Sequence, residues 1–143
     1  MICFDASVAA KWLFPEEHSA EASELLRAAL VAGEAIIAPP LFRSEVANII
    51  CQRMRRGQVD LPVARHLLAQ FLALPIALQA PDPLYDRALI IAARYNLPAV
   101  YDALYLALSE LSDATLWTAD QRLLHSIGGE LPYVHPVADY GRS

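Results

Sequence analysis

The chain has 143 residues, enough for one hydrophobic core, so we expect residues 1–143 to form a single domain. Apolar residues make up 56% of the sequence, yet no run approaches the roughly 18 apolar residues that a membrane-spanning helix needs. Charged residues interrupt the N-terminus, so we expect no signal peptide, no membrane contact and a cytoplasmic location. The formal net charge of −5 disfavours a protein that coats DNA, although a metal-binding cluster of carboxylates would add negative charge too.

The apolar excess predicts a protein partner, and the positions of the two cysteines predict a reduced state. High hydrophobicity without a membrane segment favours a partner, either a second copy of the chain or another protein. Cys3 and Cys51 fall within apolar periodic stretches. We therefore predict that both are reduced core residues and that they form no disulfide.

Short apolar runs alternate with longer helical patterns along the chain. The first run, residues 2–4, is too short and too apolar for a surface strand and predicts a buried strand of a parallel sheet. Further strands are predicted at residues 35–38, 76–78, 115–118 and 133–135. Helices are predicted over residues 6–14, 16–32, 41–56, 61–72, 82–96, 100–112 and 120–127. This alternation predicts an α/β fold with a central parallel sheet of four to five short strands flanked by about seven helices.

Two acidic residues follow predicted strands directly. Asp5 comes after residues 2–4, and Asp120 comes after residues 115–118. Each also precedes a helix, and Asp is a favoured residue for capping a helix N-terminus, so a purely structural role stays open for both. In open parallel sheets, however, chemistry collects at the carboxyl ends of the strands.

Two more acidic residues lie near the starts of predicted helices. Glu45 stands on an apolar face, where an unpaired carboxylate is costly, and the structural alternative is an ion pair with Arg43 or Arg53. Asp102 lies in the first turn of a nearly apolar helix, where the helix dipole favours an anion. That position suits a structural cap and a metal ligand equally well.

Taken together, the four acids predict a metal site. The strand ends and helix starts that carry them share one edge of a parallel sheet. Carboxylates within about 4–6 Å of one another need a compensating cation, and ligand sets made of oxygen alone suit Mg²⁺ or Mn²⁺ better than zinc. A divalent metal held by carboxylates fits hydrolysis of a phosphodiester bond.

Four short motifs resemble those of a known family. They are Phe4–Ser7, Ser44–Asn48, Tyr101–Leu108 and Thr118–Asp120. In this order the set resembles a PIN domain, and more closely the VapC toxins of bacterial toxin–antitoxin modules. The resemblance spans nearly the whole chain, and its strongest block is Tyr101–Leu108.

The resemblance implies a PIN-like fold and an endoribonuclease that depends on Mg²⁺ or Mn²⁺. By that analogy the acidic site consists of Asp5, Glu45, Asp102 and Asp120, supported through hydrogen bonds by Ser7, Asn48 and Thr118. It also implies a homodimer inhibited by a cognate VapB-like antitoxin, whose C-terminal segment crosses a groove of the toxin. Many relatives carry another Asp two residues after the fourth acid, where this chain has Arg122, so a fifth ligand is absent.

Within this site we expect Asp5, Asp102 and Asp120 to hold one metal ion, directly or through water. We expect Glu45 to position the attacking water or a second, weaker metal. An RNA substrate also needs positive charge, and arginines flank the Glu45 helix. These are Arg43, Arg53, Arg55 and Arg56, which we predict to contact phosphates, unless the last three only compensate charge at the helix C-terminus.

Two other functions stay open. A phosphatase with a nucleophilic strand-end Asp usually needs a second Asp two residues on, but that position is Ser7. A catalytically silent scaffold that binds RNA or protein is the other alternative, although retention of all four acids favours the nuclease. Tyr85, Tyr101 and Tyr105 are predicted to pack in the core or in a dimer and not to stack on bases.

Overall fold

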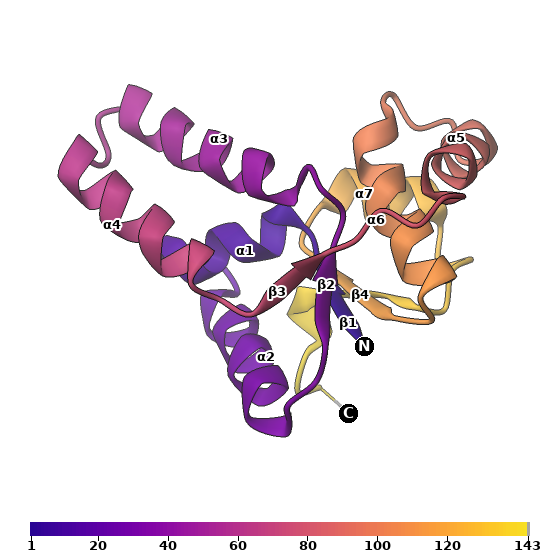
Figure 1. Ribbon diagram of the computed structural model, residues 1–143, viewed down its shortest axis with the longest axis horizontal. Coiled ribbons are helices and arrows are strands. Elements are labelled where there is room, and N and C mark those ends of the chain that lie inside the picture. Colours follow the sequence, from indigo (N-terminus) through magenta and orange to yellow (C-terminus); the bar gives the residue numbers. More distant parts are fainter. Residues whose placement is uncertain (143) are drawn as a thin grey trace.

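The computed structural model describes residues 1–142, and within them it contains five strands and seven α-helices (Figure 1). The strands are β1 (Ile2–Phe4), β2 (Ile36–Ala38), β3 (Ile76–Leu78), β4 (Thr115–Thr118) and β5 (Val134–Pro136). The helices are α1 (Ala6–Leu13), α2 (Ser19–Ala32), α3 (Phe42–Arg55), α4 (Leu61–Leu72), α5 (Leu84–Arg94), α6 (Val100–Leu111) and α7 (Gln121–Ile127), and a short 3₁₀ helix spans Val137–Asp139.

The five strands form one sheet in the order β3-β2-β1-β4-β5, and all neighbouring pairs are parallel. This confirms the predicted α/β fold. From β1 in the centre, the chain first adds β2 and β3 on one side of it. It then crosses over and adds β4 and β5 on the other side. Ligand sites of such sheets lie at this switch point, beyond the carboxyl ends of the two strands. The register pairs Phe4 with Trp117, so the next residues, Asp5 and Thr118, meet at that edge.

Alternating side chains of the strands fill two cores. Cys3 and Leu116 pack into the larger core, which includes the buried faces of α3 and α6. Phe4 and Ile36 point to the opposite face of the sheet and pack with buried residues of α2. Figure 1 shows the α3–α4 hairpin to the left of the strands and α5, α6 and α7 to the right, and both groups of helices pack in the larger core. The carboxyl edge of the sheet therefore lies between two groups of helices.

Two helices are shorter than predicted by three residues or more. The helix expected from residue 16 begins at Ser19, because the Glu16 N–H donates to Ser19 Oγ (2.9 Å) in a turn that His18 closes with a left-handed backbone (φ 64°). The helix expected over residues 82–96 spans Leu84–Arg94, and Asn96 beyond it is also left-handed (φ 52°). These turns depend on side-chain bonds and backbone geometry that apolar spacing does not report.

The prediction for the cysteines was correct for Cys3, which is buried, and wrong for Cys51, which is exposed. The buried positions of α3 are Phe42, Val46 and Ile50, which are four residues apart. Residue 51 lies about 100° around the helix from residue 50 and so falls beside this face. No helix within residues 1–142 is long and apolar enough to cross a membrane.

Candidate active site

The four predicted acids line a single cavity at the carboxyl edge of the sheet. Its volume is about 170 Å³, and Ser7 and Tyr105 also line it. Each acid comes from a different element: Asp5 follows β1, Glu45 and Asp102 lie in the first turns of α3 and α6, and Asp120 follows β4. The parallel sheet thus brings together residues up to 115 positions apart in the chain.

Asp5 is a helix cap and a member of the cluster at once. Its Oδ1 accepts hydrogen bonds from the Val8 N–H (3.2 Å) and from Ser7 Oγ (2.5 Å), and its Oδ2 accepts one from Thr118 Oγ1. The side chain is buried, with 4% of its surface exposed. Burial raises the pKa of Asp5 to about 6 although these three bonds oppose the rise, and the charge of Asp102 contributes a further increase.

Ser7 and Thr118 join the two turns that carry Asp5 and Asp120. Ser7 Oγ accepts the Ala119 N–H at 2.9 Å, and Thr118 Oγ1 accepts the Asp120 N–H at 3.0 Å. Both hydroxyls therefore donate to Asp5 while accepting from the β4–α7 turn. Two of the three predicted supporting residues thus hold the strand ends in a fixed relation.

Asp120 also caps a helix. Its Oδ1 accepts the N–H groups of Arg122 (3.0 Å) and Leu123 (3.2 Å) at the start of α7. The structural roles considered for Asp5 and Asp120 are therefore both present, and neither role removes the side chain from the cavity. Arg122, at the position of the fifth acid in many relatives, is exposed.

Glu45 is held by a tyrosine and not by an arginine. The hydroxyl of Tyr105 on α6 donates to Glu45 Oε1. The alternative of an arginine pair is wrong, because Arg53 bonds Glu16 (2.6 Å) and Arg43 forms no ion pair among the described residues. Burial raises the pKa of Glu45, the bond from Tyr105 lowers it, and the charge of Asp102 raises it further.

Asp102 is the electrostatic centre of the cluster. Burial and the charge of Asp120 raise the pKa of Asp102. The charge of Asp102 in turn raises the pKa of Asp5 and of Glu45. All four carboxylates are therefore coupled through this one side chain, and a cation placed near it would relieve the repulsion within the whole set.

The donor chemistry fits a hard divalent cation. In the described part of the chain, none of the four acids belongs to an ion pair. Within residues 1–142, no three His, Cys, Asp or Glu side chains lie close enough together to hold a metal ion jointly. Mg²⁺ commonly keeps several waters and binds one or two carboxylates directly. A cluster of uncompensated carboxylates around a small cavity suits this mixed coordination.

Not every predicted site residue lies at the cavity. Asn48 is exposed, does not line this cavity and forms no hydrogen bond with the four acids among residues 1–142, so its supporting role stays a prediction. It lines an adjoining cavity of about 370 Å³, together with Arg53 and Arg56. Arg43 and Arg55 are exposed and line neither cavity.

The structure adds residues that sequence reasoning missed. Tyr105, predicted only as a packing residue, is buried and also orients Glu45. It lies three residues after Asp102 on the same helix, and that spacing places both side chains on one face. Lys11 lines the adjoining cavity, four residues after Ser7 on α1. The helical spacing of Tyr105 from Asp102 and of Lys11 from Ser7 was the sequence signal that could have predicted both residues at the site.

The phosphatase alternative fits the geometry poorly. Both carboxylate oxygens of Asp5 accept hydrogen bonds, and the side chain is almost fully buried. Ser7, at the position of the second acid of that chemistry, donates its proton to Asp5 and offers no carboxyl group.

The fold and the site define a parallel α/β protein with a carboxylate cluster at the switch point of its sheet. The family model of the PIN domain matches residues 2–129. Ribonuclease VapC12 of Mycobacterium tuberculosis is 30% identical over 128 residues, which cover 90% of this chain and 93% of that protein. Ribonuclease VapC9 of the same species is 32% identical over 123 residues, 86% of this chain and 88% of that protein.

Solved structures agree in fold. PAE2754 from Pyrobaculum aerophilum superposes with a TM-score of 0.69 and 25% identity, covering 96% of this chain and 90% of that one. A toxin–antitoxin complex from Klebsiella pneumoniae has a chain with a TM-score of 0.58 and 19% identity, covering 96% and 98%. The chain belongs to the PIN domain family, as its four motifs predicted.

Proposed function

We propose that this protein is a metal-dependent endoribonuclease that hydrolyses RNA at the cavity lined by Asp5, Glu45, Asp102 and Asp120. The observation that carries this proposal is the gathering of four carboxylates, unpaired with any cation within residues 1–142, around one small cavity. Relatives named as ribonucleases that align with most of the chain support the choice of RNA as substrate.

In this proposal Asp5, Asp102 and Asp120 hold one Mg²⁺ or Mn²⁺ ion, one or two of them directly and the rest through water. When bound, the ion supplies positive charge that orients a water molecule and stabilises the leaving oxygen. Ser7 and Thr118 keep Asp5 in one orientation through their hydrogen bonds. Because these partners are fixed by the backbone of two turns, the acids need little reorganisation to bind.

Glu45 has a different role in this proposal. Its Oε1 accepts the Tyr105 hydroxyl, which fixes the carboxylate at the mouth of the cavity. The other oxygen then accepts a hydrogen bond from the attacking water and orients it toward the phosphorus. Its raised pKa suits a group that takes up a proton during the reaction.

Cleavage of RNA by the purified chain tests the proposal. The wild type is expected to cut a mixed pool of structured RNAs in Mg²⁺ or Mn²⁺ and to stop in EDTA. Asp102→Asn is expected to abolish cutting, because Asp102 couples to the other three acids, while circular dichroism shows an unchanged fold. Cutting that persists in Asp102→Asn or in EDTA would refute the proposed site.

We also propose that the protein is the toxin of a toxin–antitoxin pair, inhibited by a cognate VapB-like antitoxin. The VapC names of its relatives support this, and the cavity of about 370 Å³ between α1 and α3 offers a groove beside the site. An amphipathic helix of the antitoxin would lie in this groove.

Co-purification with the product of the neighbouring gene tests the antitoxin proposal. Asn48→Trp fills the groove at an exposed position and is expected to weaken the complex, whereas Val31→Trp, at a position 76% exposed on α2, is expected to leave it intact. Absence of any complex, or equal behaviour of the two variants, would count against this partner and this groove.

A further inference from the structure

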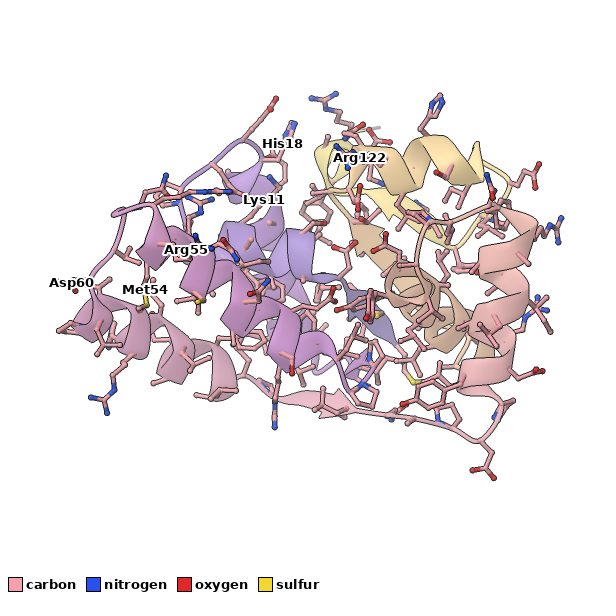
Figure 2. All side chains as sticks on the ribbon, turned by 90° about the horizontal axis from the view of Figure 1, so that it is seen from above. Lys11, His18, Met54, Arg55, Asp60 and Arg122 are labelled. Carbon is pink, nitrogen blue, oxygen red and sulfur yellow. The ribbon has the colours of Figure 1, made fainter. Side chains whose placement is uncertain are left out.

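The cavity of about 370 Å³ adjoins the acidic cavity, because Ser7 and Ile49 line both. It lies between α1 and α3. A third cavity of about 300 Å³ continues it, and Lys11 and Ala119 line both of these. Figure 2 shows Lys11 beside His18, which also lines the third cavity, while Met54 and Asp60 mark the distant tip of the α3–α4 hairpin. A groove therefore leads away from the four acids between α1 and α3, and at Lys11 it continues between the residues that follow α1 and the β4–α7 turn.

The charge of the wall changes sign along α3. Glu45 faces the acidic cavity, and Ile49, Arg53 and Arg56 follow on successive turns along the groove. The eleven steps from Glu45 to Arg56 span about 16 Å of helix axis. Lys11 of α1 faces the same cavity, so its lining carries three cations and one carboxylate, Glu16. A cationic segment thus stands next to the acidic one.

Glu16 lies where two of these cations converge. Its carboxylate accepts hydrogen bonds from Lys11 Nζ (3.3 Å) and from Arg53 Nη2 (2.6 Å). The Arg53 guanidinium is also fixed over the ring of Phe14, at 4.5 Å from its centroid. Donors from two helices that are already oriented on one anionic group form the arrangement that binds a phosphate. In the described part of the chain, the Arg56 side chain has no hydrogen-bond or ion-pair partner.

We propose that this groove binds a backbone phosphate of the RNA next to the bond that is cut, with Lys11, Arg53 and Arg56 as its donors. In the free protein the Glu16 carboxylate occupies the place of that phosphate and competes with it. The inference rests on the proposed ribonuclease function and adds the direction in which the strand leaves the acids, along α1 and α3. It also reduces the predicted arginine contacts to Arg53 and Arg56 and adds Lys11.

The proposal makes opposite predictions for the cations and for Glu16, and RNA binding without cleavage tests both. The probe is a fluorescein-labelled pool of single-stranded RNA, titrated with the Asp102→Asn protein in EDTA and followed by anisotropy at several salt concentrations. Lys11→Ala and Arg56→Ala in that background are expected to weaken binding about fivefold and to lower the salt slope by about 0.7 each. Arg55→Ala removes the same charge from an exposed neighbour outside the groove and is expected to change both values much less.

Glu16→Gln is expected to tighten binding about threefold, because it removes the charge that competes with the phosphate for Lys11 and Arg53; Lys11 keeps its bond to the Glu17 carbonyl (2.6 Å). Glu17→Gln is the matched control: it changes the net charge equally, but the Glu17 side chain is 86% exposed and pairs with His18 and not with Lys11 or Arg53 among the described residues. Equal effects of Arg55→Ala and Arg56→Ala, or of Glu16→Gln and Glu17→Gln, would overturn the proposal. Failure of the ribonuclease function itself would show separately, as absence of metal-dependent cutting by the wild type.

Discussion

Asp5 serves two purposes that conflict energetically. As a cap it stabilises the start of α1, and as a buried carboxylate beside Asp102 it repels another negative charge. The hydrogen bonds from Ser7 and Thr118 offset only part of the cost, because the pKa of Asp5 stays raised at about 6. A buried carboxylate that costs folding free energy and has no counter-ion among the described residues is typical of a functional site.

The raised pKa of Asp5 predicts a pH-dependent gain in stability for Asp5→Asn. Between pH 3.8, the ordinary value, and about 6, the folded protein binds more protons at this group than the unfolded chain. The contribution of Asp5 to stability is therefore highest at low pH and falls as the pH rises through this window, by up to about 3 kcal/mol. Asn keeps the cap but carries no charge.

Thermal unfolding in EDTA from pH 4 to pH 8 checks this prediction. Asp5→Asn is expected to match the wild type near pH 4 and to unfold at a higher temperature at pH 7.5. Asp60→Asn is the control, because Asp60 caps α4 through Val63 N–H but is exposed. A wild type that gains stability relative to Asp5→Asn as the pH rises would contradict the argument.

At the scale of the elements, local pattern predicted most of the architecture. Each strand and helix was expected from apolar spacing and from glycine and proline, and the rule that parallel strand ends share an edge predicted that four acids meet. The contact of Tyr105 with Glu45 was not predictable, because it joins residues 60 positions apart and depends on how α3 packs against α6. The turn at Glu16 was missed for a local reason, because it depends on the bond from the Glu16 N–H to Ser19 Oγ and on the left-handed backbone of His18.

The contact between α6 and α3 predicts a role for Tyr105 in catalysis. Tyr105→Phe keeps the buried ring but removes the donor to Glu45, so the carboxylate loses its fixed orientation. We expect kcat to fall about tenfold with little change in KM, in line with the loss of one hydrogen bond to a charged group. Because that bond lowers the pKa of Glu45, its removal is expected to move the acidic limb of the pH–rate profile to higher pH.

Steady-state kinetics over a pH series measure this effect, with Tyr101→Phe as the control. Tyr101 lies on the same helix but is 59% exposed. A Tyr105→Phe enzyme with unchanged kcat and an unmoved profile would show that the tyrosine serves packing alone.

At the scale of the whole molecule, one set of exposed apolar side chains lies on the neighbouring helices α5 and α6. Tyr85, Leu89 and Ile90 on α5 and Tyr101 on α6 are each about half exposed or more, and α5 and α6 pack closely. Large exposed apolar patches mark interaction surfaces. We propose that a second copy of the chain covers this face and that the protein is a homodimer, as the family resemblance implied.

Light scattering during size exclusion checks the dimer. The wild type is expected to elute as a dimer, with twice the chain mass of 15.7 kDa. Leu89→Glu, at a position 63% exposed, is expected to be a monomer. Val31→Glu places the same charge on α2 at a position 76% exposed and is expected to stay dimeric. A wild-type monomer, or a dimer that survives Leu89→Glu, would exclude this interface.

Calorimetric titration of the chain with Mn²⁺, without RNA, tests most directly whether the four acids form a metal site. Asp113→Asn is the control, because Asp113 is exposed and its left-handed backbone (φ 52°) accepts Asn. The account predicts that wild type and Asp113→Asn bind the ion and that Asp102→Asn binds it far more weakly. Equal binding by all three proteins, or no binding by the wild type, would contradict a metal centre at Asp5, Asp102 and Asp120.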